Sequence, residues 1–276
     1  LTEAWQFSYA PGYLADGTTT DALLRDATRK ASAADVALVF AGLPDSYESE
    51  GFDRQDLALP SGHERLIEAV AGAQPNAVVV LMNGSAVLMP WASRVKAILE
   101  AWLGGQAGGE AIADVIVGRS NPSGKLSETF PARLEDTPAF LDFPGRGEAR
   151  YGEGVFIGYR YYERRRITPQ FPFGHGLSYT TFGYSNLVVA AASAADAERG
   201  VLYTLAVSVK NTGARAGKEI VQLYVGESSS REPRPTKELR HFAKVSLEPG
   251  ESREVSFELR QRDFAHYDVR LHDWVV

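Results

Sequence analysis

The stretch Glu-Ser-Glu-Gly-Phe-Asp-Arg, which begins at Glu48, carries the side chains of this sequence that are best suited to chemistry. Its carboxylates are Glu48, Glu50 and Asp53, and Arg54 ends it. Carboxyl groups act as general acids, general bases or nucleophiles when their surroundings hold the required protonation state. An acidic loop by itself is usually a solvated surface feature, so its place in the fold has to decide between these two interpretations.

The order of residues in this loop favours Glu50 as the group that acts. Gly51 follows it directly and permits a sharp turn, because glycine adopts backbone angles that other residues avoid. Asp53 and Arg54 can pair with each other or with the connector further along the chain, and thereby hold the loop. We therefore expect Gly51, Asp53 and Arg54 to support the loop while Glu50 projects from it.

Other kinds of catalytic or binding site find little support in the sequence. There is no cysteine, which excludes disulfides, thiolate metal sites and a cysteine nucleophile. No serine lies in a G-x-S-x-G elbow, and no glycine-rich nucleotide motif follows a predicted strand. The five histidines lack metal-ligand spacing, and His175 fits a structural role in a tight turn. We expect neither a metal nor a cofactor.

Residues 1–132 alternate helix and strand patterns, which predicts a mostly parallel sheet with helices on both faces, an α/β sandwich. Helical spacing follows Thr20 and recurs over 62–73 and 108–118. Continuous apolar runs over 36–42 and 77–84 are typical of strands buried on both faces. Ligands of such sheets meet the loops at the carboxyl ends of the strands. Both the acidic loop and the Asn-Gly-Ser segment after the second strand occupy that position.

Glycines also cluster around Gln106, in the segment that leads into the predicted helix over 108–118. They would allow the backbone to approach an anion at the start of that helix. They would equally allow a neighbouring domain to pack closely. The sequence leaves both interpretations open.

The second half of the chain has a different character. Residues 133–182 are rich in proline, glycine and aromatic residues, which predicts a connector packed on both domains rather than disorder. Residues 183–276 show short alternating strands with turns at 211–213 and 249–250, as in a fibronectin type III-like β-sandwich.

Length and composition set the broad class. The 276 residues suggest two domains, and an apolar content of 44% with 23% charged residues is that of a globular protein. The net charge of −6 argues against nucleic acid, and no apolar run is long enough to cross a membrane. The cluster Arg164–Arg166 fits a solvated edge. The absence of cysteine favours the cytoplasm, and the chain starts without methionine, as if from inside a longer protein.

Many ordered motifs together resemble glycoside hydrolase family 3, in particular its bacterial β-glucosidases. They cover nearly the whole chain and read ESEGFDRQDLALP, VVVLMNGSAVLMPW, LEAWLGGQAGGEAIADVIVG, NPSGKLSETFP, GVFIGYRYYE, FPFGHGLSYTTF, KEIVQLYV and KELRHFAKVSLEPGE. The resemblance implies an N-terminal (β/α)8 barrel, then an α/β sandwich and a fibronectin type III-like domain.

The resemblance also implies a reaction and its residues. Family members hydrolyse terminal β-linked sugars with retention, using a nucleophilic Asp from the barrel and a Glu acid/base from the sandwich. The acid/base precedes the Gly of the loop motif, which is Glu50 here, with Glu48 as the alternative if the register differs. This chain shows no barrel, its sandwich domain looks incomplete at the N-terminal end, and its β-sandwich looks truncated at the C-terminal end.

Two functions follow as expectations. In the first, the chain is part of a retaining exo-acting β-glucosidase that cleaves terminal non-reducing β-D-glucosyl residues from β-glucosides or short β-linked oligosaccharides. It would supply Glu50, and the barrel, in cis or in trans, would supply the nucleophile. In the second, the chain is a non-catalytic carbohydrate-binding or interaction fragment that needs a separate barrel partner. Without the barrel, the surface that faces it would expose apolar patches, so self-association into a homo-oligomer is a further possibility.

Overall fold

The computed structural model describes residues 5–145, 147–230 and 232–276. Its internal contacts divide the chain into two compact units. The first, called the α/β unit, contains the described residues up to Ile116 together with Thr129–Leu141 and Thr168–Phe171. The second, called the β-sandwich unit, contains Val117–Glu128, Asp142–Ile167 and Pro172–Val276, apart from the undescribed positions. The predicted connector therefore contributes segments to both units.

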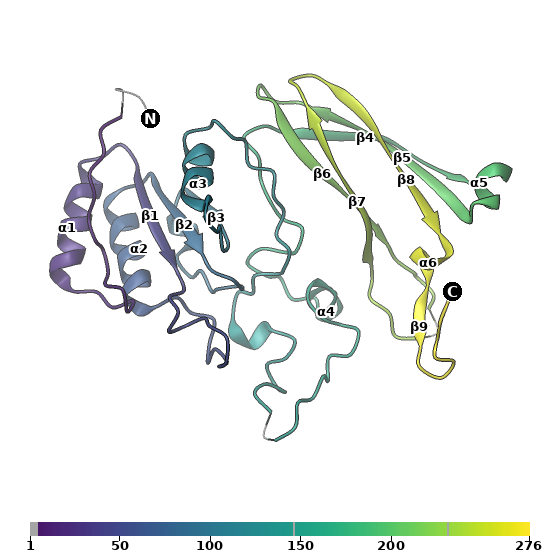
Figure 1. The fold of residues 1–276 in the computed structure, drawn as a ribbon, viewed down its shortest axis with the longest axis horizontal. Helices are drawn as coiled ribbons and strands as arrows, with labels where there is room; N and C mark the ends of the chain where they lie inside the picture. The colour runs from purple at the N-terminus through teal and green to yellow at the C-terminus, as the bar shows by residue number, and fades with distance from the viewer. Residues whose placement is uncertain (1–4, 146, 231) are drawn as a thin grey trace. The chain divides into compact units, whose positions relative to one another are not determined.

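The α/β unit is built around a parallel three-stranded sheet in the order β1-β2-β3. Figure 1 shows α1 and α2 on one side of the strands and α3 beside β3. The elements in chain order are α1 (Asp21–Ser32), β1 (Ala37–Gly42), α2 (Ser61–Ala73), β2 (Ala77–Met82), the 3-10 turn η1 (Ala92–Arg94), β3 (Ala97–Glu100), α3 (Gly108–Ile116) and the 3-10 turn η2 (Leu134–Asp136). The predicted α/β class with a parallel sheet is confirmed.

Local sequence explains where these elements begin and what they bury. Thr20 caps α1 through its hydroxyl, which accepts a hydrogen bond from the amide of Leu23 at 3.3 Å. The core between α2 and the sheet includes Ile67, Val79 and Leu81, all fully buried. Trp91, which precedes η1, is also buried, with 1% of its surface exposed.

The first strand differs from its prediction. The apolar run over 36–42 predicts burial on both faces, but Leu38 and Phe40 of β1 are 37% and 41% exposed. β1 contacts α2, and its buried side chains are Val39 and Ala41, which alternate with Leu38 and Phe40 along the strand. Hydrophobicity indicates that a side chain can be buried, but whether a neighbour covers it depends on the tertiary arrangement.

The β-sandwich unit consists mainly of antiparallel strands in two sheets, β4-β5-β8 and β6-β7, which confirms the predicted fold class. Their inner faces share a core of Val209, Val221, Val245, Leu247 and Val255. The elements are α4 (Tyr159–Arg165), β4 (Phe182–Ala191), α5 (Ala194–Glu198), β5 (Val201–Asn211), β6 (Gly217–Val225), β7 (Glu238–Leu247), β8 (Ser252–Arg260), α6 (Gln261–Phe264), β9 (His266–Asp268) and β10 (Asp273–Val275).

Three features of this unit bear on later arguments. The turn after β5 is organised by Asn211, which is fully buried. Its side chain bonds to four partners: Thr180, Gly213, Arg215 and Leu247. The predicted connector also contains a short helix, α4. Trp274 of β10 is 44% exposed, with the guanidinium of Arg262 lying 3.1 Å from its ring centre.

The His175 turn behaves as the sequence suggests. Its backbone amide donates to Pro172 at 3.1 Å, and its carbonyl accepts from Leu126 at 2.7 Å. Burial, with a further contribution from the Lys125 charge, lowers the pKa of its ring. His175 is thus a hydrogen-bonded turn residue of the β-sandwich unit.

Candidate active site

Three loops leave the same edge of the α/β unit's sheet. β1, β2 and β3 run parallel, with Gly42 paired to Met82 and Leu81 paired to Glu100. The acidic loop follows Gly42, the Asn-Gly-Ser segment follows Met82, and Trp102 lies two residues after Glu100. Because the carboxyl ends of parallel strands share one edge, these loops can exchange hydrogen bonds.

Glu48 is fastened to the second of these loops. Its Oε2 accepts a hydrogen bond from the amide of Gly84 at 2.6 Å, and its Oε1 accepts one from the hydroxyl of Ser85 at 2.8 Å. A Cβ at position 84 would stand only 3.0 Å from Oε1, so the absence of a side chain lets the carboxylate approach. Both carboxylate oxygens of Glu48 are therefore engaged in holding one loop to the next.

Arg54 binds the same neighbouring loop. Its Nη1 donates to the hydroxyl of Ser85 at 2.8 Å and to the carbonyl of Ala86 at 3.2 Å. Arg54 is half-buried, whereas Asp53 is exposed. Arg54 thus connects the acidic loop to the segment after β2.

Glu50 lies between these two anchors and is exposed. Within residues 5–145, 147–230 and 232–276, its carboxylate accepts no hydrogen bond and forms no ion pair. Gly51 has a φ of +97°, a conformation that favours glycine, and it turns the chain immediately after Glu50. The two glutamates therefore differ: Glu48 is bonded to a backbone amide and a hydroxyl group, and Glu50 is exposed.

A buried histidine secures the point where the acidic loop begins. The amide of Gly42 donates to Nδ1 of His63 at 3.3 Å, and the ring of Tyr13 lies 3.7 Å from the His63 ring. His63 is 4% exposed, and burial lowers its pKa to about 4, so the ring is neutral near pH 7. An unprotonated Nδ1 can accept the Gly42 bond, whereas a protonated one cannot.

The third loop joins the network through Asn83 and Glu100. Asn83 is fully buried, and its Nδ2 donates to the carbonyl of Ser85 at 2.9 Å and to Oε2 of Glu100 at 3.4 Å. Oε1 of Glu100 accepts from the amide of Trp102 at 2.9 Å, where Trp102 holds a φ of +49°. The Trp102 ring packs against Phe130 at 5.8 Å. A continuous set of hydrogen bonds therefore runs across all three loops.

Sequence reasoning identified this edge, the acidic loop and the Asn-Gly-Ser segment, but it gave no individual role to Asn83, Gly84 or Ser85 and did not point to His63 or Glu100. The sequence does hold a signal for Asn83, Gly84 and Ser85, because this Asn-Gly-Ser segment follows a buried strand at the edge where ligands bind. Nothing in the order of residues shows that one serine meets both Glu48 and Arg54. That meeting depends on the strand register.

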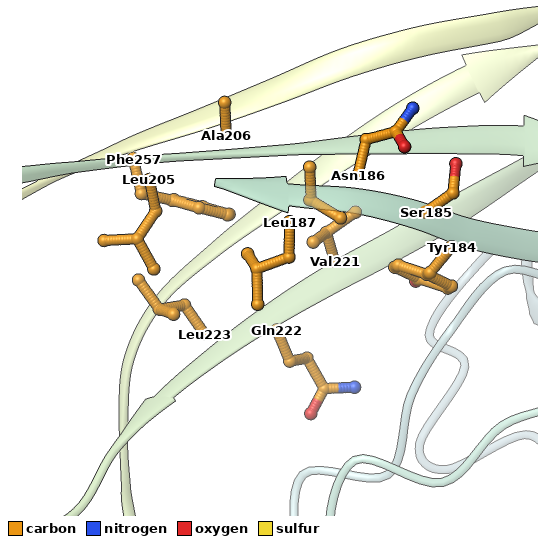
Figure 2. A pocket seen from close by; sticks show the side chains of 11 residues that line it. Tyr184, Ser185, Asn186, Leu187, Leu205, Ala206, Val221, Gln222, Leu223 and Phe257 are labelled. Carbon is orange, nitrogen blue, oxygen red and sulfur yellow. The ribbon is translucent and has the colours of Figure 1, made fainter. Parts of the chain in front are cut away.

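A cavity in the β-sandwich unit offers different chemistry. Figure 2 shows it between the two sheets, with a volume of ≈ 460 Å³. Apolar side chains dominate its lining, among them Leu187, Leu205, Val221 and Phe257. Its ionisable group is Tyr184, whose pKa is raised to about 12 by burial and then by Glu219.

Among the described residues there is neither a candidate metal site nor a candidate membrane span. No cluster of histidine, cysteine, aspartate or glutamate there has the geometry to hold a metal ion. None of the helices in that part of the chain is long and apolar enough to cross a membrane.

Comparison with protein-family models gives two matches in order along the chain. Residues 5–179 match the glycosyl hydrolase family 3 C-terminal domain. Residues 219–276 match the fibronectin type III-like domain. The acidic loop and the Asn-Gly-Ser segment lie within the first match.

Known relatives agree with these matches. The chain is 53% identical over 270 residues to the thermostable beta-glucosidase B of Acetivibrio thermocellus, covering 97% of this chain and 35% of that protein. It is 45% identical over 271 residues to an exo-alpha-(1->6)-L-arabinopyranosidase of Bifidobacterium longum, again covering 97% and 35%. The crystal structure of a GH3 beta-glucosidase of Bifidobacterium adolescentis superimposes with a TM-score of 0.90 at 44% identity, covering 97% of this chain and 39% of that one.

Proposed function

The chain belongs to glycosyl hydrolase family 3, and from this membership we propose that it forms the part of a retaining β-glucosidase that supplies the general acid/base, Glu50. The chain spans about a third of the length of the curated relatives it matches. The proposal therefore assigns the nucleophilic Asp to a (β/α)8 barrel outside these 276 residues. The barrel would be the partner of the α/β unit, in cis or in trans.

The contrast between the two glutamates supports Glu50. A general acid must reach the glycosidic oxygen with its carboxyl group free to donate a proton. Glu50 is exposed on the loop, whereas both oxygens of Glu48 already accept hydrogen bonds. A carboxyl group whose two oxygens are engaged within the protein would have to leave these partners before it could reach a leaving group.

The proposed mechanism uses Glu50 twice. It first donates its proton to the leaving-group oxygen while the nucleophile attacks the anomeric carbon. It then removes a proton from the water that hydrolyses the glycosyl-enzyme. This double displacement requires the two carboxyl groups to lie about 5 to 5.5 Å apart. Gly51, Asp53 and Arg54 are proposed to support the loop, with Arg54 acting through the bonds described above.

The substrate proposed is a terminal non-reducing β-D-glucosyl residue, on a β-glucoside or a short β-linked oligosaccharide. The name of the A. thermocellus relative supports glucose. The B. longum relative carries a different sugar in its name, so aryl β-D-glucoside and aryl α-L-arabinopyranoside should be compared directly. The proposal expects the larger kcat/KM on the glucoside.

The test compares Glu50→Gln with Glu48→Gln in the polypeptide that joins this chain to its barrel. General acid catalysis contributes about 10²- to 10⁴-fold to a rate. Glu50→Gln should therefore lower kcat/KM by that order on cellobiose, whose leaving group needs a proton. On 2,4-dinitrophenyl β-glucoside, whose leaving group needs none, formation of the glycosyl-enzyme should persist.

Azide distinguishes the two glutamates. It attacks the glycosyl-enzyme without a general base, so it should restore turnover of the dinitrophenyl substrate in Glu50→Gln and yield β-glucosyl azide. Glu48→Gln keeps an acid at position 50 and should show no azide acceleration. Azide rescue of Glu48→Gln instead of Glu50→Gln would move the assignment to Glu48.

A further inference from the structure

Ser85 occupies an unusual place in the hydrogen-bond network of the α/β unit. Its hydroxyl donates to Oε1 of Glu48 at 2.8 Å and accepts from Nη1 of Arg54 at 2.8 Å. A hydroxyl has one proton and two lone pairs, a guanidinium can only donate, and a carboxylate can only accept. The direction of both bonds is therefore fixed, and each has a charged partner, which strengthens it.

The two charged partners stand on either side of Glu50 in the sequence. Glu48 precedes it by two positions and Arg54 follows it by four, with the turn at Gly51 between them. Both ends of the segment from Glu48 to Arg54 therefore bond to one residue outside it, Ser85. Closing both ends at one point restricts the orientations that Glu50 can adopt.

Ser85 is itself held firmly. Its carbonyl accepts a hydrogen bond from Nδ2 of the fully buried Asn83 at 2.9 Å. Asn83 directly follows Met82, the last residue of the central strand β2. The closing point of the acidic loop is therefore connected to the most deeply buried strand of the sheet.

We infer that Ser85 is a positioning residue for Glu50: its hydroxyl joins Glu48 to Arg54 and thereby fixes the direction in which Glu50 projects. This inference rests on the proposed function of Glu50 as the acid/base. Ser85 takes no part in proton transfer. Its effect is on geometry, and displacement of a catalytic group by about 1 Å can cost on the order of 100-fold in rate.

A positioning role for Ser85 differs from a general structural role in one respect: the effect of removing its hydroxyl should depend on whether the leaving group needs a proton. In the barrel-containing polypeptide, Ser85→Ala should lower kcat on cellobiose by about 10- to 100-fold, with KM changed by less than about 3-fold. Formation of the glycosyl-enzyme from 2,4-dinitrophenyl β-glucoside should change by less than about 3-fold, since that step needs no proton. Ser85→Thr, which keeps the hydroxyl, should recover most of the cellobiose activity.

Controls and a second variant complete the test. Ser46→Ala makes the same chemical change at an exposed serine near the start of the acidic loop and should leave both substrates unaffected. If Ser85→Ala fails to fold, Arg54→Lys, which keeps the charge but loses the guanidinium, should give the same selective loss on cellobiose. A double variant, Ser85→Ala with Arg54→Lys, should lose little more than either single change because both break one unit.

The results for Ser85→Ala and Glu50→Gln test the positioning role of Ser85 and the acid/base role of Glu50 separately. An equal loss on both substrates, or no loss on cellobiose, in Ser85→Ala would overturn the positioning role. If Glu50→Gln itself kept its activity on cellobiose, the proposed function would fall, whatever Ser85→Ala does. Loss in Glu50→Gln together with selective loss in Ser85→Ala supports both.

Discussion

Each unit contains a fully buried asparagine at the end of a strand, and the two asparagines hold different kinds of loop. In the α/β unit, Asn83 follows β2 and donates to Ser85 and Glu100, whose segments leave the carboxyl edge of the parallel sheet. In the β-sandwich unit, Asn211 ends β5 and bonds to Gly213 and Arg215 in the turn that follows. It also bonds to Leu247 at the end of β7 and to Thr180 just before β4. Residue type and burial are the same in both.

This difference shows that the arrangement of strands decides which segments a buried polar side chain can hydrogen-bond. Parallel strands end together, so a polar group at one strand end can reach loops that come from its neighbours. The turn after β5 leads to β6 in the other sheet, so Asn211 reaches the segments next to β4 and β7 as well as its own turn. A buried asparagine thus connects loops that leave one edge of a single sheet in the first case, and fastens a turn to the ends of strands from two sheets in the second.

The largest effect that tests this comparison is on the stability of the β-sandwich unit. Asn211→Ala removes four side-chain hydrogen bonds, each worth about 1 kcal/mol, so the free energy of unfolding should fall by about 4 kcal/mol. Asn83→Ala removes two and should cost about 2 kcal/mol. Urea denaturation followed by circular dichroism measures both.

The kcat on cellobiose should also differ between the variants of the two asparagines. Below the unfolding midpoint, Asn211→Ala should leave kcat on cellobiose unchanged, while Asn83→Ala should lower it because Ser85 loses its support. Equal loss of kcat in the two variants would show that the topology argument is wrong.

The next effect is on the pH dependence of stability in the α/β unit. His63 is neutral in the fold with a pKa of about 4, against an ordinary value of 6.5 for an exposed histidine. Below pH 6.5 the unfolded chain takes up a proton that the folded chain does not. The stabilisation is therefore complete above pH 6.5 and is lost as the pH falls toward 4, by roughly 3 kcal/mol.

The non-titrating variant His63→Gln isolates this contribution from that of the carboxylates. The wild-type free energy of unfolding should decline more steeply between pH 7 and pH 5 than that of the variant, as measured by urea titration at each pH. Parallel curves would contradict the burial argument for His63.

The smallest effect is expected on the surface of the β-sandwich unit. Arg199 bonds to Asp196 at 2.7 Å and to Glu258 at 2.9 Å, but its side chain is 55% exposed. Exposed ion pairs contribute little because water and salt screen them. Arg199→Ala should leave the unfolding midpoint within experimental error at 0.15 M salt. A clear fall in the unfolding midpoint at 0.15 M salt that disappears at 1 M salt would contradict this, because it would show that the exposed ion pairs of Arg199 stabilise the unit.

Much of the fold could be predicted from local patterns. The Thr20 cap, the helical spacing of α2 and the glycine that ends β1 place the α/β elements within a residue or two. The alternation after residue 183, with a turn at Pro249-Gly250, predicts the antiparallel strands. The sequence does not reveal helix α4, because the Pro, Gly and aromatic residues around it conceal a helix of about two turns between Gly158 and Arg166.

The candidate site could be predicted only in part. Glu50, Gly51 and Arg54 stand together in the sequence, so their loop is visible there. The bonds from Glu48 and Arg54 to Ser85 join residues 37 and 31 positions apart, and they exist because β1 and β2 pair in one register. The role of His63 was hidden too, because a histidine within a helix gives no sign of the backbone amide that it will meet.

The distribution of tryptophans gives each unit its own optical signal. Three of the four, Trp5, Trp91 and Trp102, belong to the α/β unit, and Trp274 belongs to the β-sandwich unit. The buried Trp91 should emit at short wavelength and resist acrylamide, whereas the exposed Trp274 should emit to the red and be quenched readily. In a Trp274→Phe protein the remaining fluorescence would come from the α/β unit alone, and the difference from the parent spectrum would follow the β-sandwich unit through the same melt.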